Sequence, residues 1–569
     1  MKKIASLFAL ASSFASPFLH ADAPAQKEKP PFRIIYNNDT TNILSSVSAF
    51  NKDGKGFTTE KIIASVNETA DCGGVDVLMM ASGMGWDPWW QSKALPMKAH
   101  TDWQLKRKGQ NPNAYQKYIL DGNDLVDTFA AQAHKRGQVV FATYRMNDGH
   151  HYFGNARIED PEQRATRMAI TQFFDENPQF RLGEEADPDS RTKYALDFVH
   201  PEVRAYRMQF IKELAQKDID GIELDFMRFW MLFHPFRTTS GQRADIVTDF
   251  VKEVRAEIDE HAKPGQRRYL CLRIPAYRDV MDKIGIDPAR LATEAGVDMF
   301  NVSSSGYSNL QNEAALIKKM LPENVAVYTE QVYASAKQNY KVPVGQTKEG
   351  KHFIYEPGTA PADAKISWIF RRTTDQALIT AAHMAYARGV DGLSFFNFQY
   401  YRSTRNETDA HGGNFEPPYY LFKLLRDPDY VKKQDQYYFL GHAHNEPARD
   451  GRPFQNVFVS ETPQTQWLDM APPEGGWNKD GRLRIQSIDD LTNTEWSVSI
   501  NGVELVPNAD VSEPYKNPYD TALGTPKNYK AFTVPVKLLK DGLNEITVIL
   551  KNGKPTPLFY LDIALSASK

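Results

Sequence analysis

Apolar and polar positions follow one repeating order over the first two thirds of the chain. Eight short apolar runs each end in polar or charged residues and are followed by a stretch with apolar residues at helical spacing. A strand followed by a helix eight times predicts an α/β fold, a parallel (β/α)8 TIM barrel, whose chemistry lies at the carboxyl ends of its strands. We predict strands at 32–37, 75–81, 138–145, 219–226, 269–274, 297–303, 325–330 and 392–398.

The helical stretches between these runs show their limits in the sequence. Several end at a glycine just before the next strand, as helices commonly do, and examples are Gly137, Gly296 and Gly389. A doubly wound open sheet is the alternative fold, but it would need a glycine-rich phosphate turn after the first strand. Residues 37–41 contain no glycine, so we favour a barrel over 33–434 with long insertions. The helices are predicted at 125–136, 201–216, 244–261 and 375–388.

The pattern changes after residue 434. Residues 482–488, 495–500 and 545–550 alternate apolar with polar side chains, which is typical of half-buried strands. Asn501-Gly502 and Asn552-Gly553 resemble tight hairpin turns. We therefore predict a C-terminal β-sandwich domain over 435–569, which either supports the barrel or binds carbohydrate.

The amino terminus resembles a secretory signal. Met1-Lys2-Lys3 precedes an apolar run that is too short and too interrupted for a membrane anchor. We expect a signal peptide at 1–21, a tether at 22–32, and export to the periplasm or the outside of the cell. Cys72 and Cys271 are too few for a disulfide framework and are interpreted as small core residues.

Composition excludes some classes of partner. With 68 Lys and Arg against 71 Asp and Glu, the net charge is −3, which favours neither nucleic acid nor a membrane surface. Aromatic residues make up 12% of the chain, which suits a sugar-binding cleft or a large core. Three of them, Trp86, Trp89 and Trp90, lie in the insertion at 82–122 and either stack on sugars or plug the side of the barrel.

The fourth strand carries two carboxylates on one face. Glu223 and Asp225 are two residues apart, and side chains alternate along a strand, so both should point into the barrel near its top. Each is a candidate catalytic group. The structural alternative is an ion pair with a lysine or arginine from a neighbouring strand.

The end of the third strand gathers further polar groups. An arginine, a carboxylate and two histidines, Arg145, Asp148, His150 and His151, occupy seven residues. Either histidine is a candidate general base that Asp148 would orient. A metal site and an ordinary surface loop are the competing interpretations. We expect no metal and no cofactor, because ligands at helical spacing do not recur elsewhere in the chain.

Arginines end three successive strands. Arg145, Arg228 and Arg273 suggest an anionic substrate, because guanidinium groups match carboxylates geometrically. The alternative is that each arginine pairs with a local acid. Asn38, Tyr144 and His151, beside these charged strand ends, complete the predicted substrate-binding set.

Two more carboxylates stand at strand ends. Asp39 follows the first strand and Glu330 ends the seventh, so both are placed to reach the same cleft. Glycoside hydrolysis needs a proton donor and a second group that activates water or attacks the anomeric carbon. The candidates for these roles are Asp39, Asp148, His150, Glu223, Asp225 and Glu330.

At these residues the chain resembles a known class of protein. Segments 197–204 and 220–228 resemble the middle of bacterial glycoside-hydrolase-like barrels, over roughly 33–430. More narrowly, the chain resembles the inverting exo-sialidases built on a (β/α)8 barrel. Those enzymes also have an aspartate after the first strand and a histidine five residues after an arginine, as His150 follows Arg145. The resemblance implies that Asp39 and His150 are the catalytic pair and that Arg145 and Arg228 bind a sugar carboxylate.

Three functions follow as hypotheses. The first is an exported exo-glycosidase that releases a terminal acidic sugar, sialic acid, from a glycan or glycoprotein. The second is a neutral-sugar glycosidase with Asp225 as acid/base and Glu330 as nucleophile. The third is a non-catalytic glycan-binding barrel. The sequence gives no indication of the oligomeric state.

Overall fold

A computed structural model describes most of the chain. The predicted signal peptide and most of the tether lie outside the described residues. Among the described residues no helix has both the length and the apolar character needed to cross a membrane. The described residues are 28–45, 49–51, 56–84, 87–150, 170–183, 195–228, 231–304, 306–346, 352–355, 359–402, 415–441, 457–519 and 524–568.

Eight parallel strands close into a barrel, as the sequence predicts. Each strand pairs with its neighbours in the order of the chain, and the last strand closes on the first through the pair Ile34 and Leu393. All eight predicted strands are confirmed, with ends that differ by a few residues. The barrel strands are β1 (Ile34–Asn38), β2 (Val77–Ala81), β5 (Val139–Arg145), β6 (Gly221–Asp225), β7 (Tyr269–Pro275), β8 (Met299–Ser303), β9 (Ala326–Val332) and β13 (Gly392–Phe396).

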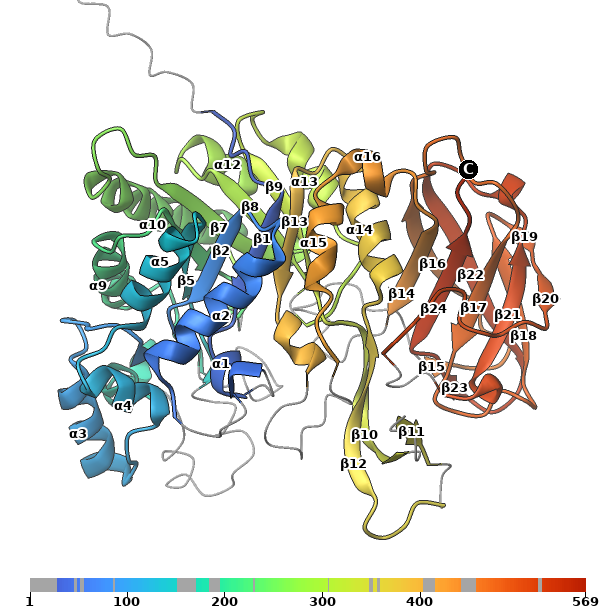
Figure 1. The fold of residues 1–569 in the computed structure, drawn as a ribbon, viewed down its shortest axis with the longest axis horizontal. Helices are drawn as coiled ribbons and strands as arrows, with labels where there is room; N and C mark the ends of the chain where they lie inside the picture. The colour runs from blue at the N-terminus through green and yellow to red at the C-terminus, as the bar shows by residue number, and fades with distance from the viewer. Residues whose placement is uncertain are drawn as a thin grey trace, which may run out of the picture.

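Helices cover the outside of this barrel (Figure 1). The four predicted helices are confirmed. Two of them are followed by a glycine with positive φ, Gly137 in one case and Gly389 in the other. The helices that follow the strands are α2 (Thr59–Cys72), α5 (Leu125–Lys135), α9 (Pro201–Ala215), α10 (Ser240–Glu260), α12 (Pro288–Thr293), α13 (Ala314–Met320), α14 (Asp375–Ala387), α15 (Phe422–Leu425) and α16 (Pro428–Val431). Shorter helices in the connections are α1 (Asn42–Ser45), α8 (Gln172–Glu176) and α11 (Arg278–Lys283).

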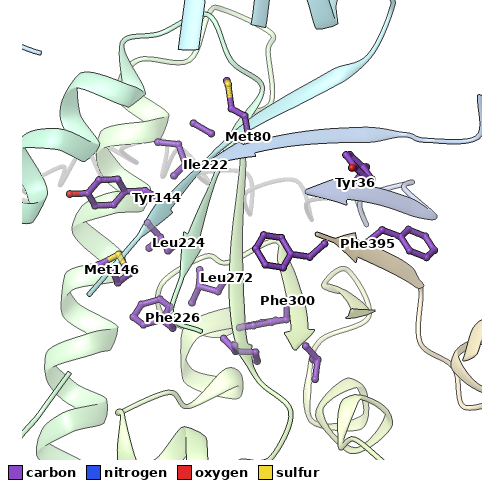
Figure 2. Packing of buried hydrophobic residues seen from close by; sticks show 14 of the residues in the cluster. Tyr36, Met80, Tyr144, Met146, Ile222, Leu224, Phe226, Leu272, Phe300 and Phe395 are labelled. Atoms are coloured by element: carbon purple, nitrogen blue, oxygen red, sulfur yellow. The ribbon is translucent and has the colours of Figure 1, made fainter. Parts of the chain in front are cut away.

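Outward-facing apolar side chains join the strands to the helices. Figure 2 shows Tyr144, Ile222 and Leu224 among these packed residues, which are almost completely buried. Because side chains alternate along each strand, the intervening residues point into the barrel. This alternation decides which polar residues can reach the site.

The insertion at 82–122 is structured and packs on the barrel. It contains β3 (Gly83–Met84), β4 (Asp87–Pro88), α3 (Met97–Lys108) and α4 (Ala114–Leu120). Trp89 stacks on Tyr115 with ring centroids 4.2 Å apart, and Trp90 donates its indole N–H to Glu213 at 2.8 Å. Both tryptophans are buried, so they plug the side of the barrel. Trp86 lies outside the described residues.

A second insertion follows β9. A long hairpin of β10 (Ala334–Gln346) and β12 (Lys365–Arg372), with β11 (His352–Ile354), forms a separate three-stranded sheet. The hairpin extends from the barrel on the side of α3 and α4, at the bottom of Figure 1.

The C-terminal part is a β-sandwich of a five-stranded and a four-stranded sheet, as predicted. The Asn501-Gly502 turn is confirmed: both residues have positive φ and join β18 to its partner β19. The second predicted turn is wrong, because Asn552 still belongs to β22 and the next strand, β23, pairs with β15. One sheet contains β14 (Gln436–Gly441), β24 (Tyr560–Leu565), β17 (Gly481–Gln486), β21 (Tyr529–Val534) and β20 (Val506–Asn508); the other contains β16 (Gln464–Met470), β22 (Gly542–Asn552), β18 (Glu495–Ile500) and β19 (Val503–Glu504), and β15 (Val457–Phe458) pairs with β23 (Thr556–Pro557).

Barrel and sandwich meet around an ion cluster that is largely buried. Arg371, at the end of the hairpin, donates to Glu513 at 2.8 Å, and Glu513 also accepts from Arg484 of β17 at 3.0 Å. Arg484 in turn binds Asp562 through two hydrogen bonds of 3.1 and 2.7 Å. We call these four residues the interface cluster. The two cysteines are unpaired, as predicted. Cys271 is a buried core residue inside the barrel, whereas Cys72 is only partly buried.

Candidate active site

The barrel interior changes from apolar to polar along its axis. At the amino ends of the strands, apolar side chains such as Phe32, Phe141 and Tyr328 fill it, and the ring of Phe32 lies 5.1 Å from that of Tyr269. Toward the carboxyl ends, inward positions carry amide, hydroxyl, carboxyl and guanidinium groups. The polar end is where chemistry is expected in a barrel of this type.

Glu223 occupies the middle of the barrel and is completely buried. Its Oε1 accepts hydrogen bonds from Asn37 Nδ2 at 2.6 Å and Thr143 Oγ1 at 3.0 Å, and its Oε2 accepts from Asn301 Nδ2 at 3.2 Å. Burial, together with the negative charge of Asp225, raises the pKa of Glu223 to about 7. Glu223 therefore points inward as predicted, below the mouth of the barrel.

Above Glu223, Arg273 lies between two carboxylates. Its Nη1 donates to Asp225 Oδ2 at 3.0 Å, while Nε and Nη2 each donate to Glu330 at 2.7 Å. Ser303 Oγ donates to the same Glu330 at 2.6 Å, and the guanidinium carbon lies 4.4 Å from the ring centre of Phe396. Asp225 and Glu330 thus share one arginine, the structural alternative that the sequence left open.

A second series of charged groups runs along the mouth from β1 to β6. Asp39 accepts from Arg145 Nη2 at 3.0 Å, and Arg145 Nη1 donates to Asp148 at 3.1 Å. Asp148 Oδ1 accepts the backbone N–H of His150 at 2.9 Å and contacts its Nδ1. His150 Nε2 in turn lies 3.2 Å from Arg228 Nη2, which donates to it. We call these five residues the mouth series.

The charges of the mouth series set its protonation. Burial alone would raise the pKa of Asp39, but the positive charges of Arg145 and Arg228 hold it below its usual value. For Asp148, the contact with His150 and the charge of Arg145 outweigh burial and lower the pKa strongly. Burial, with the charges of Arg228 and Arg145, lowers the pKa of His150 although Asp148 opposes this shift. Both carboxylates are therefore ionised at neutral pH, and His150 is neutral.

The three strand-end arginines differ in exposure. Arg145 is 5% exposed and Arg273 1% exposed, and each lies between two carboxylates. Arg228 is partly exposed, and His150 keeps 18% of its side chain exposed. Among these groups, Arg228 and His150 are the ones that present charge and an imidazole to solvent at the mouth.

Two predicted binding residues point away from the mouth. Asn38 faces the helices and donates to Ser65 of α2 at 2.8 Å, because its neighbour Asn37 occupies the inward position. Tyr144 also faces outward (Figure 2). Its hydroxyl accepts from Arg207 of α9 at 2.9 Å. Both predictions are wrong for the same reason, because side chains alternate along a strand. Asn38 follows the inward Asn37, and Tyr144 precedes the inward Arg145, so each points to the helices.

Other inward residues escaped the sequence analysis. Asn37, Thr143 and Asn301 surround Glu223, and Ser303 binds Glu330. Their positions in the strands could have identified them. Each lies on the same face as a predicted inward charge, an even number of residues away along its own strand or along a strand in register with it. His151 lies outside the described residues. Within the described ranges, no three His, Cys, Asp or Glu side chains group as a metal site would require.

No model of a protein family and no curated protein matches the sequence. Solved structures with a similar overall path include the alpha-amylase from H. orenii, at 11% identity and a TM-score of 0.36, covering 92% of this chain and 100% of that one. A putative alpha-L-fucosidase from Bacteroides thetaiotaomicron is similar at 10% identity and 0.33, covering 94% and 95%. A cycloisomaltooligosaccharide glucanotransferase from Paenibacillus sp. is similar at 9% and 0.33, where 93% of this chain spans 57% of that one. These values identify neither a family nor a substrate.

Proposed function

We propose that the protein is a glycoside hydrolase that releases a terminal acidic sugar, sialic acid, from glycans. One observation carries the proposal: Asp39, Arg145, Asp148, His150 and Arg228 form a continuous hydrogen-bonded series at the barrel mouth. The proposal would have failed if these residues had lain on opposite rims. Their arrangement supports the resemblance to inverting barrel exo-sialidases.

Arg228 is the group best suited to meet the sugar carboxylate. It is partly exposed, whereas Arg145 is enclosed by Asp39 and Asp148. A guanidinium group binds a carboxylate through charge-assisted hydrogen bonds and favours it over a neutral hydroxymethyl group. In this proposal Arg145 contributes positive charge from behind and keeps both acids in place.

Asp39 and His150 would divide the two proton transfers of an inverting reaction. Asp39 is held ionised and is therefore suited to accept a proton from the attacking water. His150 would give a proton to the leaving oxygen, with Asp148 holding Nδ1. Burial and the charge of Arg228 lower the pKa of His150, and a substrate carboxylate bound to Arg228 offsets that charge, so the imidazole takes up from solvent the proton that it then donates.

The neutral-sugar alternative has weaker support in this geometry. Its proposed acid/base, Asp225, and its proposed nucleophile, Glu330, are both hydrogen-bonded to Arg273. Both oxygens of Asp225 and both oxygens of Glu330 accept hydrogen bonds, so either group must break one to react. Among the described residues, the bonds to Asp39 from Arg145 and Thr41 both reach Oδ1, which leaves Oδ2 for the attacking water. Asp225 and Glu330 are therefore better suited to hold the mouth together than to attack a sugar.

A set of aryl glycosides tests the proposal. We expect the purified full chain to hydrolyse an aryl sialoside and to leave neutral aryl glycosides unchanged, with inversion at the anomeric carbon followed by proton NMR. Hydrolysis of neutral substrates alone would overturn the proposal in favour of the Asp225 and Glu330 pair. Saturable binding of sialosides without turnover would overturn it in favour of a glycan-binding barrel.

A further inference from the structure

Asp225 connects the two groups of charges at the mouth. Its Oδ1 accepts the backbone N–H groups of Met227 at 2.8 Å and Arg228 at 3.2 Å. Its Oδ2 accepts from Arg273 at 3.0 Å, and the side chain is 2% exposed. One carboxylate therefore caps the turn that follows β6 and pairs with a neighbouring strand at the same time.

The carboxylate of Asp225 is fixed from behind. Arg273 cannot follow a rotation of Asp225, because two of its nitrogens bind Glu330 and one of these also binds Ser303 at 3.1 Å. The ring of Phe396 covers the face of the guanidinium group. A planar group held on three sides presents its remaining N–H in one direction.

This cap determines where Arg228 leaves the backbone. Two hydrogen bonds from successive N–H groups to one carboxylate oxygen fix the chain direction at the tip of β6, as in other turns capped by aspartate. From that turn, the Arg228 side chain reaches the loop that follows β5 and places Nη2 3.2 Å from His150 Nε2.

We infer that Asp225 is a positioning residue, which holds Arg228 against His150 and does not itself contact the substrate. Arg273 and Glu330 complete the support by fixing Asp225. The kinetic consequences of this role rest on the proposed function. The positioning itself does not, because it concerns contacts within the protein.

The loss of the Asp225 charge and the release of Arg228 would change the pKa of His150 in opposite directions. The charged groups that face its imidazole are Arg145 at the end of β5, Asp148 in the loop after β5, Arg228 in the turn after β6, and Asp39 directly after β1. Removing Asp225 only as a negative charge lowers the pKa of His150. Releasing Arg228 from its place removes a nearby positive charge and raises that pKa.

Histidine NMR on the full chain measures whether the pKa of His150 rises or falls. The signal of His150 is identified by its loss in His150→Ala, and its pKa is followed in Asp225→Ala with and without Arg228→Ala. We expect Asp225→Ala to raise the pKa by about half a unit to one unit when Arg228 is present, on the scale of a charge a few ångströms away. We expect no rise in the Arg228→Ala background. A lower pKa in both backgrounds would overturn the inference.

Asp225→Ser is the matched control. Its hydroxyl oxygen can still accept the backbone N–H two residues on, but it carries no charge. We expect the pKa of His150 to fall in Asp225→Ser and to rise in Asp225→Ala, and equal shifts would contradict the cap. Should Asp225→Ala fail to fold, Asp225→Ala and Asp225→Ser are compared in a chain that also carries Arg273→Met and Glu330→Gln. The charges of residues 225, 273 and 330 are then removed together, so no unpaired charge stays buried.

Kinetics then separate this inference from the proposed function. With an aryl sialoside, Arg228→Ala and Asp225→Ala should raise KM by a similar factor, and the double variant should be no worse than Arg228→Ala alone. Multiplied effects would show that Asp225 acts independently of Arg228. A wild-type chain without turnover removes the proposed function, whereas the NMR result still decides the positioning role.

Discussion

The molecule contains two largely buried groups of arginines and carboxylates, and they differ in their balance of charge and in their place in the fold. In the interface cluster, two arginines face two carboxylates, and the rings of Tyr529 and Tyr560 lie against the guanidinium groups. At the mouth, four carboxylates face three arginines, and the series ends at the partly exposed His150 and Arg228.

The comparison shows which property of a buried ion network indicates chemistry. Both networks contain almost completely buried arginines, so burial and perturbed charge alone would nominate both as functional sites. Each network also keeps one partly exposed acid or imidazole, Glu513 at 24% and His150 at 18%, but only the mouth network lies at the carboxyl ends of barrel strands. The interface network is balanced in charge and links the hairpin of the barrel to the sandwich, which suits a structural role.

Opening the interface cluster should give the largest effect, and on stability alone. Arg484→Met leaves Asp562 without its two arginine hydrogen bonds and weakens the hold on Glu513. We expect a loss of about 3–5 kcal/mol in the free energy of unfolding, the usual scale for breaking a buried ion pair. Urea unfolding measures it, and adding Asp562→Asn should recover part of the loss. A lower kcat per folded molecule would contradict the division between the two networks.

Removing the imidazole at the open end of the mouth series should give the next largest effect, on turnover. His150→Ala is expected to lower kcat on an aryl sialoside by about a hundredfold or more, because a proton-transfer group is lost. The thermal midpoint should change little, since His150 is partly exposed. Arg482→Ala, an arginine of the sandwich that contacts backbone oxygens, is a suitable control with unchanged kcat. Unchanged turnover in His150→Ala would remove His150 from the reaction.

The protonation of Glu223 should make the free energy of unfolding depend on pH. Its folded pKa of about 7 exceeds the value of 4.5 expected in the unfolded chain, so its contribution to stability is complete below pH 4.5 and is lost as pH rises to 7. Between pH 5 and 6.5 the wild type should lose about 2 kcal/mol relative to Glu223→Gln. Urea unfolding of both chains at the two pH values measures the difference. A constant difference would mean that Glu223 is ionised throughout.

The sequence predicted the fold more completely than the site. Strand positions follow from apolar runs and their helical partners, so all eight barrel strands and the sandwich were predictable. Asp39, Arg145 and His150 were predictable as a group because parallel strands end at one rim. The clamp of Asp225 and Glu330 by Arg273 was not, because the sequence does not reveal which of several neighbouring charges will pair.

The errors at Asn38 and Tyr144 have a physical cause and lead to the smallest expected effect. A strand reverses the direction of its side chains at every residue, so an error of one position exchanges the mouth for the helix layer. Asn38 donates to Ser65 outside the barrel, whereas Asn37 binds Glu223 inside it.

Asn38→Ala should therefore lower stability by about 1 kcal/mol, the scale of one hydrogen bond, and leave kcat/KM for an aryl sialoside within twofold. Asn37→Ala is the matched control, because it removes a donor from Glu223 one position away and should move the pH dependence of unfolding. Kinetic parameters and urea midpoints of both variants test the alternation directly. A large loss of kcat/KM in Asn38→Ala would mean that the outer face of β1 contributes to the site, and that the alternation along this strand does not separate the site from the helix layer.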